Sequence, residues 1–414
     1  MSVIRPFKAV RPLPEYAGEV AALPYDVMNS QEAAEMVVGK PHSFLHVDRA
    51  EIDLPEGTDM YSDEVYQKAK SNLEALVTDG ICKKDEKPMY YIYRQLMGGR
   101  AQTGLVACAS VDDYVENKIK RHELTRADKE VDRLKHVSIC NANTGPIFLT
   151  HRPDDELKFV MREWMMSHDA VYDFLSDDGV GSKVWAVDDD ETINKITEIM
   201  GGIDSLYIAD GHHRCASAVS VGLQRRKENP DYDCTEEFNY FLAVIFSCDD
   251  LQIMAYNRVI KDLNGMTVEK LLERISEKFE VKKIGAELYS PKARHSFGML
   301  VDGVWYCLTA KEGTYDDNDP VNSLDVSILQ NNLIGPVLGI TDPRTDKRID
   351  FVGGIRGLGE LDRRVKTDMR LAFSMYPTSI EELMKIADIG KIMPPKSTWF
   401  EPKLLSGLFI HELD

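Results

Sequence analysis

The residues of this chain best suited to chemistry lie in one short segment, Ile208–Cys215, which reads Ile-Ala-Asp-Gly-His-His-Arg-Cys. Apolar residues just before it predict a short buried strand, and the small residues of Ala216–Val219 predict the first turns of a helix. Where a strand turns into a helix, the backbone N–H groups of the helix N-terminus point toward an anion. We therefore predict a phosphate-binding turn made of Gly211, His212, His213 and Arg214, with the acidic Asp210 beside it.

A purely structural interpretation of this turn stays open. Asp-Gly is a common turn dipeptide, and a histidine pair can satisfy buried backbone groups without binding a ligand. The flanking strand and small-residue helix favour the phosphate site, because sites where a ligand approaches the backbone are built in this way. Cys215, at the end of the segment, is predicted to be a small packed residue rather than a reactive thiol.

Bulk properties limit the class of protein. A chain of 414 residues is long enough for two or three domains, and 43% hydrophobic with 29% charged residues is typical of a soluble globular protein. The formal net charge of −19 repels phosphate backbones, which argues against general nucleic-acid binding. A local basic pocket remains compatible with that charge.

Cysteine usage and hydropathy indicate the compartment. The seven cysteines are odd in number, widely spaced and without a CxxC pair, which argues against a disulfide framework or a zinc knuckle. The longest apolar run, Phe241–Phe246, is far shorter than the roughly 20 residues that span a bilayer, and it predicts a buried strand. With no secretory signal visible at the start, we expect a cytoplasmic protein with free thiols and no membrane contact.

Apolar spacing and turn signals predict an α+β (mixed α/β) fold. Tyr90–Tyr93 and Gln102–Ala107 are expected to pair as strands, and Phe297–Val301 and Val304–Leu308 to form a hairpin. Pro41–Val47 is also predicted to be a strand. Three regions are expected: an N-terminal α/β region (1–150), a central region with the phosphate turn (151–262) and a C-terminal α/β region that packs back on the core (263–414).

Two further polar segments attract attention. Residues 118–133 carry densely alternating charges, a pattern typical of a solvated helix with i,i+4 ion pairs. The tail 392–404 is too apolar and too rich in proline for a loose terminus, so we expect it to pack across the body. Anion contacts in this tail are available from Lys396, Ser397, Thr398 and Lys403.

Six motifs occur together in an order that identifies a family. They are Arg5–Phe7, Pro24–Val27, Arg121–Thr125, Asp132–Arg133, Ala209–Arg214 and Met393–Thr398. On these residues the chain is identified as a member of the bacterial and archaeal family called domain of unknown function 1015, over essentially its whole length. The Asp-Gly-His-His-Arg block more distantly resembles the ParB and sulfiredoxin-like superfamily, which includes nucleotide-binding partition proteins and free serine kinases.

That distant resemblance implies a chemistry. It implies a ParB/sulfiredoxin-like nucleotide-binding core elaborated by N- and C-terminal regions, with ATP or ADP and Mg²⁺ as cofactors. Glu123 then matches the kinase base that accepts a hydroxyl proton, and Asp210 matches the second acidic residue, which binds Mg²⁺ or orients the attacking group. Further phosphate contacts are expected from Arg121, His122, Thr125, Lys129, Arg133, Lys396 and Ser397.

Three functions follow as hypotheses. The first is a nucleotide-dependent phosphotransferase acting on a small hydroxyl substrate, with free serine as the acceptor that the resemblance suggests. The second is a nucleotide-binding regulatory protein without turnover. The third is a metal-dependent hydrolase with His212, His213 and Asp210 as ligands, which is disfavoured because adjacent histidines in one turn point in different directions. The expected partners are the nucleotide and a small substrate, and a homodimer is one candidate assembly.

Overall fold

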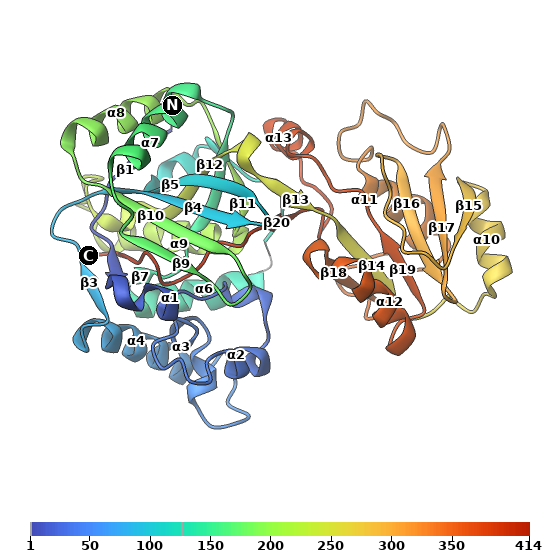
Figure 1. Cartoon of the computed structure of the whole chain (residues 1–414), viewed down its shortest axis with the longest axis horizontal. Coiled ribbons are helices and arrows are strands. Elements are labelled where there is room, and N and C mark those ends of the chain that lie inside the picture. Colours follow the sequence, from blue (N-terminus) through green and yellow to red (C-terminus); the bar gives the residue numbers. More distant parts are fainter. Residues whose placement is uncertain (1, 126) are drawn as a thin grey trace. The chain divides into compact units, whose positions relative to one another are not determined.

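The computed structural model describes residues 2–125 and 127–414, and it divides into two compact units (Figure 1). Unit 1 comprises Met1–Arg121, Thr125–Leu251 and Pro402–Asp414, and unit 2 comprises His122–Leu124 and Gln252–Glu401. Most of the predicted regions 1–150 and 151–262 therefore falls within one unit. The predicted region 263–414 is divided at Pro402, because the segment that follows packs in unit 1.

A large mixed sheet forms the centre of unit 1. In spatial order its strands are β6 (Ile119–Lys120), β11 (Leu206–Asp210), β8 (Ile147–His151), β12 (Tyr240–Ser247), β5 (Arg100–Ser110), β4 (Tyr90–Met97), β10 (Gly181–Val187) and β9 (Tyr172–Leu175), and β1 (Ile4–Arg5) also pairs with β5. The pairs β11–β6 and β12–β8 are parallel, whereas the other pairs are antiparallel. The predicted pairing of Tyr90–Tyr93 with Gln102–Ala107 is confirmed.

The composition of β12 explains its central place. Its apolar residues from Phe241 onward are buried on both faces, as in a strand covered on both sides.

Helices of unit 1 are α1 (Ala17–Val20), α2 (Ser30–Met36), α3 (Leu45–Asp48), α4 (Asp63–Thr78), α5 (Val111–Val115), α6 (Ala127–Cys140), α7 (Asp155–Ser167), α8 (Asp190–Gly202) and α9 (His212–Glu228). Asp154 and Asp189 cap α7 and α8 by accepting hydrogen bonds from Leu157 N and Thr192 N.

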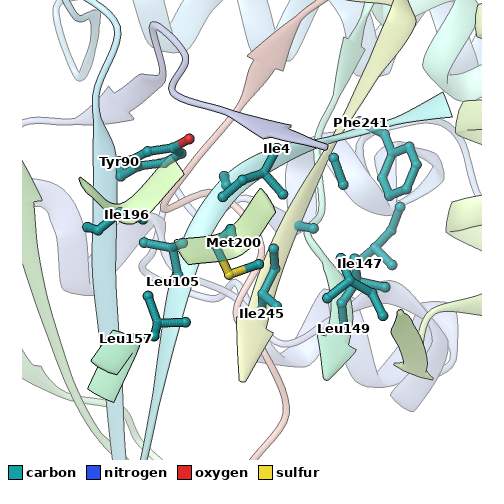
Figure 2. Packing of buried hydrophobic residues seen from close by; sticks show 14 of the residues in the cluster. Ile4, Tyr90, Leu105, Ile147, Leu149, Leu157, Ile196, Met200, Phe241 and Ile245 are labelled. Carbon is teal, nitrogen blue, oxygen red and sulfur yellow. The ribbon is translucent and has the colours of Figure 1, made fainter. Parts of the chain in front are cut away.

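The main hydrophobic core of unit 1 joins the sheet to these helices (Figure 2). Leu105 and Ile245 contribute from β5 and β12, and Leu157, Ile196 and Met200 contribute from α7 and α8. Cys215 of α9 belongs to the same core and is fully buried, and burial raises the pKa of its thiol. The prediction that Cys215 is a packed residue is therefore confirmed.

A second core in unit 1 corrects one prediction. Pro41–Val47, predicted to be a strand, instead leads into the short helix α3. Phe44, Leu45 and Val47 are buried against α4, and Phe44 N donates to Val20 O. This packing against a helix overrides the local strand propensity of the segment. The same unit contains the short pairs β2 (Val10–Pro12) with β3 (Cys82–Lys84) and β7 (Ala142–Asn143) with β21 (His411–Glu412).

Unit 2 is built on an antiparallel sheet. In spatial order its strands are β15 (Phe279–Gly285), β17 (Val304–Ala310), β16 (Ser296–Val301), β19 (Leu371–Ser374), β14 (Tyr256–Ile260) and β18 (Ile349–Gly353). β13 (Gln252–Met254) pairs separately with β20 (Trp399–Glu401). The helices are α10 (Val268–Ser276), α11 (Asp325–Leu329), α12 (Gly357–Thr367) and α13 (Ile380–Asp388). The predicted hairpin of residues 297–308 is confirmed as β16 and β17.

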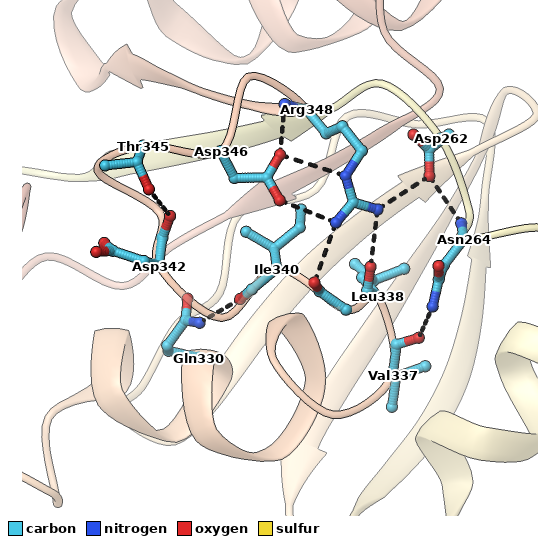
Figure 3. Close-up of polar contacts among 11 residues, drawn as sticks. Asp262, Asn264, Gln330, Val337, Leu338, Ile340, Asp342, Thr345, Asp346 and Arg348 are labelled. Carbon is cyan, nitrogen blue, oxygen red and sulfur yellow. Dashed lines mark hydrogen bonds and ion pairs between the residues drawn. The ribbon is translucent and has the colours of Figure 1, made fainter.

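A single arginine holds the loop before β18 in place (Figure 3). Arg348 Nη2 lies 2.9 Å from Asp346 Oδ2, and its Nη1 lies 3.5 Å from Asp262 Oδ1. The same guanidinium donates to the carbonyl oxygens of Leu338 and Gly339, each at 3.1 Å. Arg348 is thus surrounded by carboxylates as well as carbonyls, which is how proteins accommodate a partly buried charge.

The mixed α/β class predicted from the sequence is confirmed by these two sheets and their helices. The described cysteines are free thiols, as expected. Within residues 2–125 and 127–414, none of the helices has the length and apolar character that a bilayer crossing requires.

Candidate functional site

The predicted strand, turn and helix of residues 206–228 are present in unit 1. β11 ends at Asp210, Gly211 has φ of 88° and α9 starts at His212. A β-carbon at Gly211 would lie 3.2 Å from Arg214 Nε, so both the backbone conformation and the close guanidinium require glycine. The first turn of α9 contains no acidic residue, which leaves its N-terminal N–H groups without a carboxylate of their own helix.

Asp210 is fixed by two contacts at the end of β11. Lys403 Nζ lies 2.8 Å from Asp210 Oδ2, and Gly211 N donates to Oδ1 at 2.8 Å. Burial alone would raise the pKa of Asp210, but the charges of Lys403 and Arg214 outweigh it and hold that pKa well below its usual range. A shift of register between Ile208 and Asp210 in the β11–β8 pairing also redirects this carboxylate.

Arg214 lies in the first turn of α9 and is partly buried. Its Nη1 donates to Pro146 O at 2.5 Å, whereas its buried Nε has no hydrogen-bond partner among the described residues. Burial lowers the pKa of Arg214, but the carboxylates of Asp26 and Asp210 more than offset this and the pKa is raised. The guanidinium is therefore charged and keeps an unused donor beside the turn.

A small polar cavity lies next to Arg214 within unit 1. Its volume is about 20 Å³, which is room for a water-sized group. The polar residues that line it are Tyr25, Asp48, Arg133, His136, Asn143, Thr144 and Arg214. The motifs Pro24–Val27, Asp132–Arg133 and Ala209–Arg214, far apart in the sequence, thus meet at one cavity.

Charges around this cavity are largely compensated inside the unit. Arg133 Nε donates to Asp132 Oδ2 at 3.0 Å, and its guanidinium lies 4.0 Å from the centre of the Tyr25 ring. Thr144 Oγ1 donates to Asp48 Oδ1 at 3.1 Å. Arg133 was predicted as a phosphate contact, and the structure places it with Arg214 at the same cavity.

His136 adds an unused acceptor to the cavity. Its Nε2 lies 3.1 Å from Val47 O, so Nε2 is the protonated nitrogen and donates to that carbonyl. Burial and the nearby Arg133 lower the pKa of His136, which keeps the ring neutral near pH 7. The remaining nitrogen, Nδ1, is a buried lone pair without a hydrogen-bond partner among the described residues.

Three other predicted phosphate contacts in unit 1 make local interactions instead. Arg121 Nη1 donates to Tyr114 OH at 3.3 Å, and Lys129 Nζ donates to Tyr61 OH at 3.1 Å. Thr125 Oγ1 donates to a carboxylate oxygen of Glu130. His212 is buried and His213 half-buried at the start of α9. The phosphate roles of these residues stay predictions.

The remaining predicted residues belong to unit 2. His122 O accepts a hydrogen bond from Met393 N at 2.8 Å, which joins the segment of Glu123 to the Met393–Thr398 segment. Ser397 Oγ donates to Pro394 O at 2.6 Å, and Lys396 has φ of 58°. The pairing of Glu123 with Asp210 in one site stays a prediction.

Sequence reasoning missed several groups at the cavity. His136 lies three residues after Arg133 on α6, so helical spacing could have placed it on the same face as the predicted arginine. Asp48 and Thr144 carry no comparable signal, because only tertiary packing brings their segments to Arg214. Lys403 was expected to contact an anion, and the anion it meets is the side chain of Asp210.

Comparisons with known proteins give a family but no activity. A family model described as "Protein of unknown function (DUF1015)" matches residues 4–327, so the chain belongs to this family, as its motifs indicated. A search of curated proteins found no match.

Similar solved structures include a mutant free serine kinase in complex with AMP, at 16% identity and a TM-score of 0.38, covering 71% of this chain and 87% of that one. A conserved hypothetical protein from Pyrococcus furiosus has 17% identity and a TM-score of 0.36, covering 74% and 94%. SbnI from Staphylococcus aureus, truncated at its C-terminus, has 11% identity and a TM-score of 0.37, covering 73% and 85%.

Proposed function

We propose that this member of the DUF1015 family binds the phosphate groups of ATP or ADP at the turn between β11 and α9 and transfers a phosphoryl group to a small hydroxyl substrate. The observation that carries the proposal is the left-handed Gly211 followed by a helix N-terminus with Arg214 in its first turn. Backbone N–H groups and a guanidinium are the donors that phosphate oxygens prefer. The unused Nε of Arg214 is one such donor.

The residues around the turn fit a nucleotide phosphate better than a metal ion held by Asp210. Both oxygens of Asp210 already accept hydrogen bonds, one from Gly211 N and one from Lys403 Nζ. We therefore assign Asp210 the role of holding the Lys403 ammonium beside the turn, where its charge favours an incoming phosphate. Mg²⁺ then belongs with the phosphates of the nucleotide, where it would neutralise their charge.

The proton acceptor in this proposal is Glu123, on the strength of the motif resemblance. The substrate hydroxyl oxygen forms a bond to the terminal phosphorus of the nucleotide, and the bond from that phosphorus to the bridging oxygen breaks. The hydroxyl proton passes to the Glu123 carboxylate, and the electron pair of the broken bond stays on the bridging oxygen of the leaving nucleotide, which is ADP from ATP or AMP from ADP. Positioning and charge neutralisation provide most of the catalysis in such reactions. Free serine is the acceptor that the resemblance supports.

Two measurements on the full chain test the proposal. Calorimetric titration with ADP and Mg²⁺ should show saturable binding, which Arg214→Ala weakens about tenfold or more because a charge-assisted hydrogen bond is lost. Lys227→Gln, which removes an exposed charge near the far end of the same helix, is the matched control and should bind as the natural chain does.

The second measurement follows phosphoryl transfer from ATP or ADP to serine and to other small alcohols. Glu123→Gln should keep nucleotide binding and lose transfer. Binding without transfer in the natural chain would assign a regulatory role instead. No nucleotide binding at all would overturn the proposal.

A further inference from the structure

A buried arginine in unit 2 lacks the carboxylate that such a group normally has. Arg258 lies on β14 and is 4% exposed. Its Nη2 donates to Lys396 O at 3.0 Å, and its Nη1 donates to Tyr256 O. No carboxylate among the described residues forms an ion pair with it, and its other N–H donors have no hydrogen-bond partner there.

Burying a guanidinium in this way is unfavourable. Burial lowers the pKa of Arg258 to about 10, so the surroundings disfavour its charged form. Buried charges in proteins are ordinarily paired or engaged with a ligand. Arg348 of the same unit illustrates the usual solution, because Asp262 and Asp346 flank it (Figure 3). The exception at Arg258 therefore indicates a missing counter-ion.

Arg258 contacts the backbone of a second positively charged residue, Lys396. Lys396 is exposed, and its Nζ lies 5.4 Å from the centre of the Tyr256 ring, while its carbonyl accepts the hydrogen bond from Arg258. Lys396 also has φ of 58°, a left-handed conformation that few residues other than glycine adopt and that occurs often at binding sites. The hydrogen bond from Arg258 thus goes to the carbonyl of a residue that itself carries a positive charge, in a chain whose net charge is −19.

Partly exposed aromatic rings complete the cluster. The guanidinium of Arg258 lies 5.5 Å from the centre of the Phe351 ring. Tyr256 contacts Phe351 and Trp399 at centroid distances of 5.9 and 5.0 Å. The nearby carboxylate of Glu401 accepts a hydrogen bond from Trp399 Nε1 at 2.7 Å and forms no ion pair with Arg258.

We propose that Arg258 and Lys396 form an oxyanion site of the phosphate class on unit 2, with Tyr256, Phe351 and Trp399 as its aromatic wall. The guanidinium supplies a planar pair of donors, and Lys396 adds a second positive charge. The residues of this site belong to unit 2, whereas the α9 turn belongs to unit 1, and the proposal does not depend on the proposed function. The oxyanion is either free phosphate or the phosphate group of an organic molecule, whose apolar part would lie against the wall.

The test uses the full chain labelled with 5-fluorotryptophan. The four tryptophans give separate ¹⁹F signals, and Trp399→Phe identifies the one in the wall. Inorganic phosphate and phenyl phosphate are titrated separately. We expect a saturable shift of the Trp399 signal with both, and a lower dissociation constant for phenyl phosphate if the natural ligand is an organic phosphate. Equal constants would indicate free phosphate.

Lys396→Gln should weaken this titration about tenfold, the effect of losing one charge-assisted contact. Since Lys396 is exposed, this variant is expected to fold. The matched control is Lys391→Gln, which removes an exposed charge from the same segment and should leave the titration unchanged.

Three results would overturn the proposal. An unchanged Trp399 signal would show that Arg258 has only a structural role, the hydrogen bond from β14 to Lys396 O. Equal weakening by the two lysine variants would show general charge attraction. A shift of the Trp164, Trp185 or Trp305 signals without Trp399 would place the phosphate elsewhere, including at the α9 turn.

Discussion

Arg214 in unit 1 and Arg258 in unit 2 present the same side chain in opposite electrostatic surroundings. Each donates to a backbone carbonyl, Pro146 O in one case and Lys396 O in the other. Around Arg214, the carboxylates of Asp26 and Asp210 offset burial and raise the pKa. Around Arg258, burial lowers the pKa to about 10, and no carboxylate in the described part of the chain opposes this shift.

The difference shows what each unit can do without a ligand. Unit 1 supplies its own counter-charges, so the turn before α9 needs no ligand to balance its charges. A phosphate bound there as proposed would find its donors in place. Unit 2 leaves a positive charge uncompensated, so an anion binding there would replace an interaction that the fold lacks. An arginine alone does not identify an anion site; the carboxylates around it decide whether the site is internally balanced or open.

The largest effect is expected from a carboxylate that unit 2 leaves without a cation in contact. Asp325, at the start of α11, accepts a hydrogen bond from His295 N, but its Oδ2 is buried without a partner among the described residues. Burial raises the pKa of Asp325 to about 7. The folded state then binds more protons than the unfolded state between about pH 4 and pH 7, so stability should fall as the pH rises through that interval.

The free energy of unfolding should fall by at most about 4 kcal/mol across this interval, because each pH unit between about 4 and 7 contributes about 1.36 kcal/mol. Chemical denaturation at several pH values measures it. Asp325→Asn should remove most of this pH dependence and should be more stable than the natural chain at pH 8. A pH profile identical in the two proteins would show that Asp325 is not the titrating group.

The second prediction concerns the carboxylate that Lys403 and Arg214 share in unit 1. Asp210→Asn leaves the half-buried ammonium of Lys403 and the guanidinium of Arg214 without their shared carboxylate, which should cost about 3 kcal/mol at pH 7. Because the pKa of Asp210 is lowered on folding, this stabilisation is present above the unfolded pKa of about 4 and is lost as the pH falls below it. Urea denaturation of the natural chain and of Asp210→Asn at pH 7 and pH 3 measures the loss of stability and its dependence on pH.

A suitable control is Asp204→Asn, an exposed residue shortly before β11. It should change the free energy of unfolding by no more than about 0.5 kcal/mol. If the two variants behaved alike, the Asp210–Lys403 pair would contribute nothing to the turn.

The third prediction concerns the backbone of the turn. Gly211→Ala forces a β-carbon into a left-handed conformation and toward Arg214 Nε, and we expect a loss of about 1–2 kcal/mol. Gly265→Ala in unit 2 has a similar φ of 74° but open space around the added carbon. Thermal unfolding of the two variants is compared. Both lose stability through backbone strain, and only Gly211→Ala adds the contact with Arg214. An equal loss in the two variants would mean that Arg214 moves aside freely.

The smallest effect is expected at Arg258 itself. Arg258→Met removes two hydrogen bonds to carbonyls but also removes an unpaired buried charge, so the free energy of unfolding should change by less than about 1 kcal/mol. Arg214→Met should cost clearly more, because it removes the positive charge near Asp26 and leaves Asp210 with Lys403 alone. Denaturant titration of both variants checks the contrast, and a greater loss for Arg258→Met would reverse it.

Local signals predicted the elements that position the α9 turn. The apolar run of Phe241–Phe246 became the central strand β12, and the residues on either side of Gly211 became β11 and α9. In these segments the local preference and the tertiary packing agree. The strand predicted at Pro41–Val47 was wrong, because the apolar residues of this segment pack against α4 and lead into the helix α3.

The cavity behind the turn could not be predicted to the same extent. Asp48, Thr144 and Arg214 come from three separate segments, and neither spacing nor periodicity relates positions so far apart. Lys403 is the extreme case, since it meets Asp210 across 193 positions of the chain. The reactive residues of the turn could be predicted from the sequence. The oppositely charged residues that shift their pKa values, such as Lys403 beside Asp210, come close to them only in the folded chain.

Unit 1 contains segments that precede and follow Gln252–Glu401 of unit 2 in the sequence, and this has a consequence for biosynthesis. Residues 402–414 complete unit 1, yet the ribosome reaches them only after Gln252–Glu401 of unit 2 has been made. A nascent chain that ends before Lys403 therefore lacks the ion-pair partner of Asp210, and of the two cations only Arg214 is present near this carboxylate. If the turn binds a nucleotide as proposed, binding should begin only after synthesis has passed Lys403, however early the sheet of unit 1 has formed.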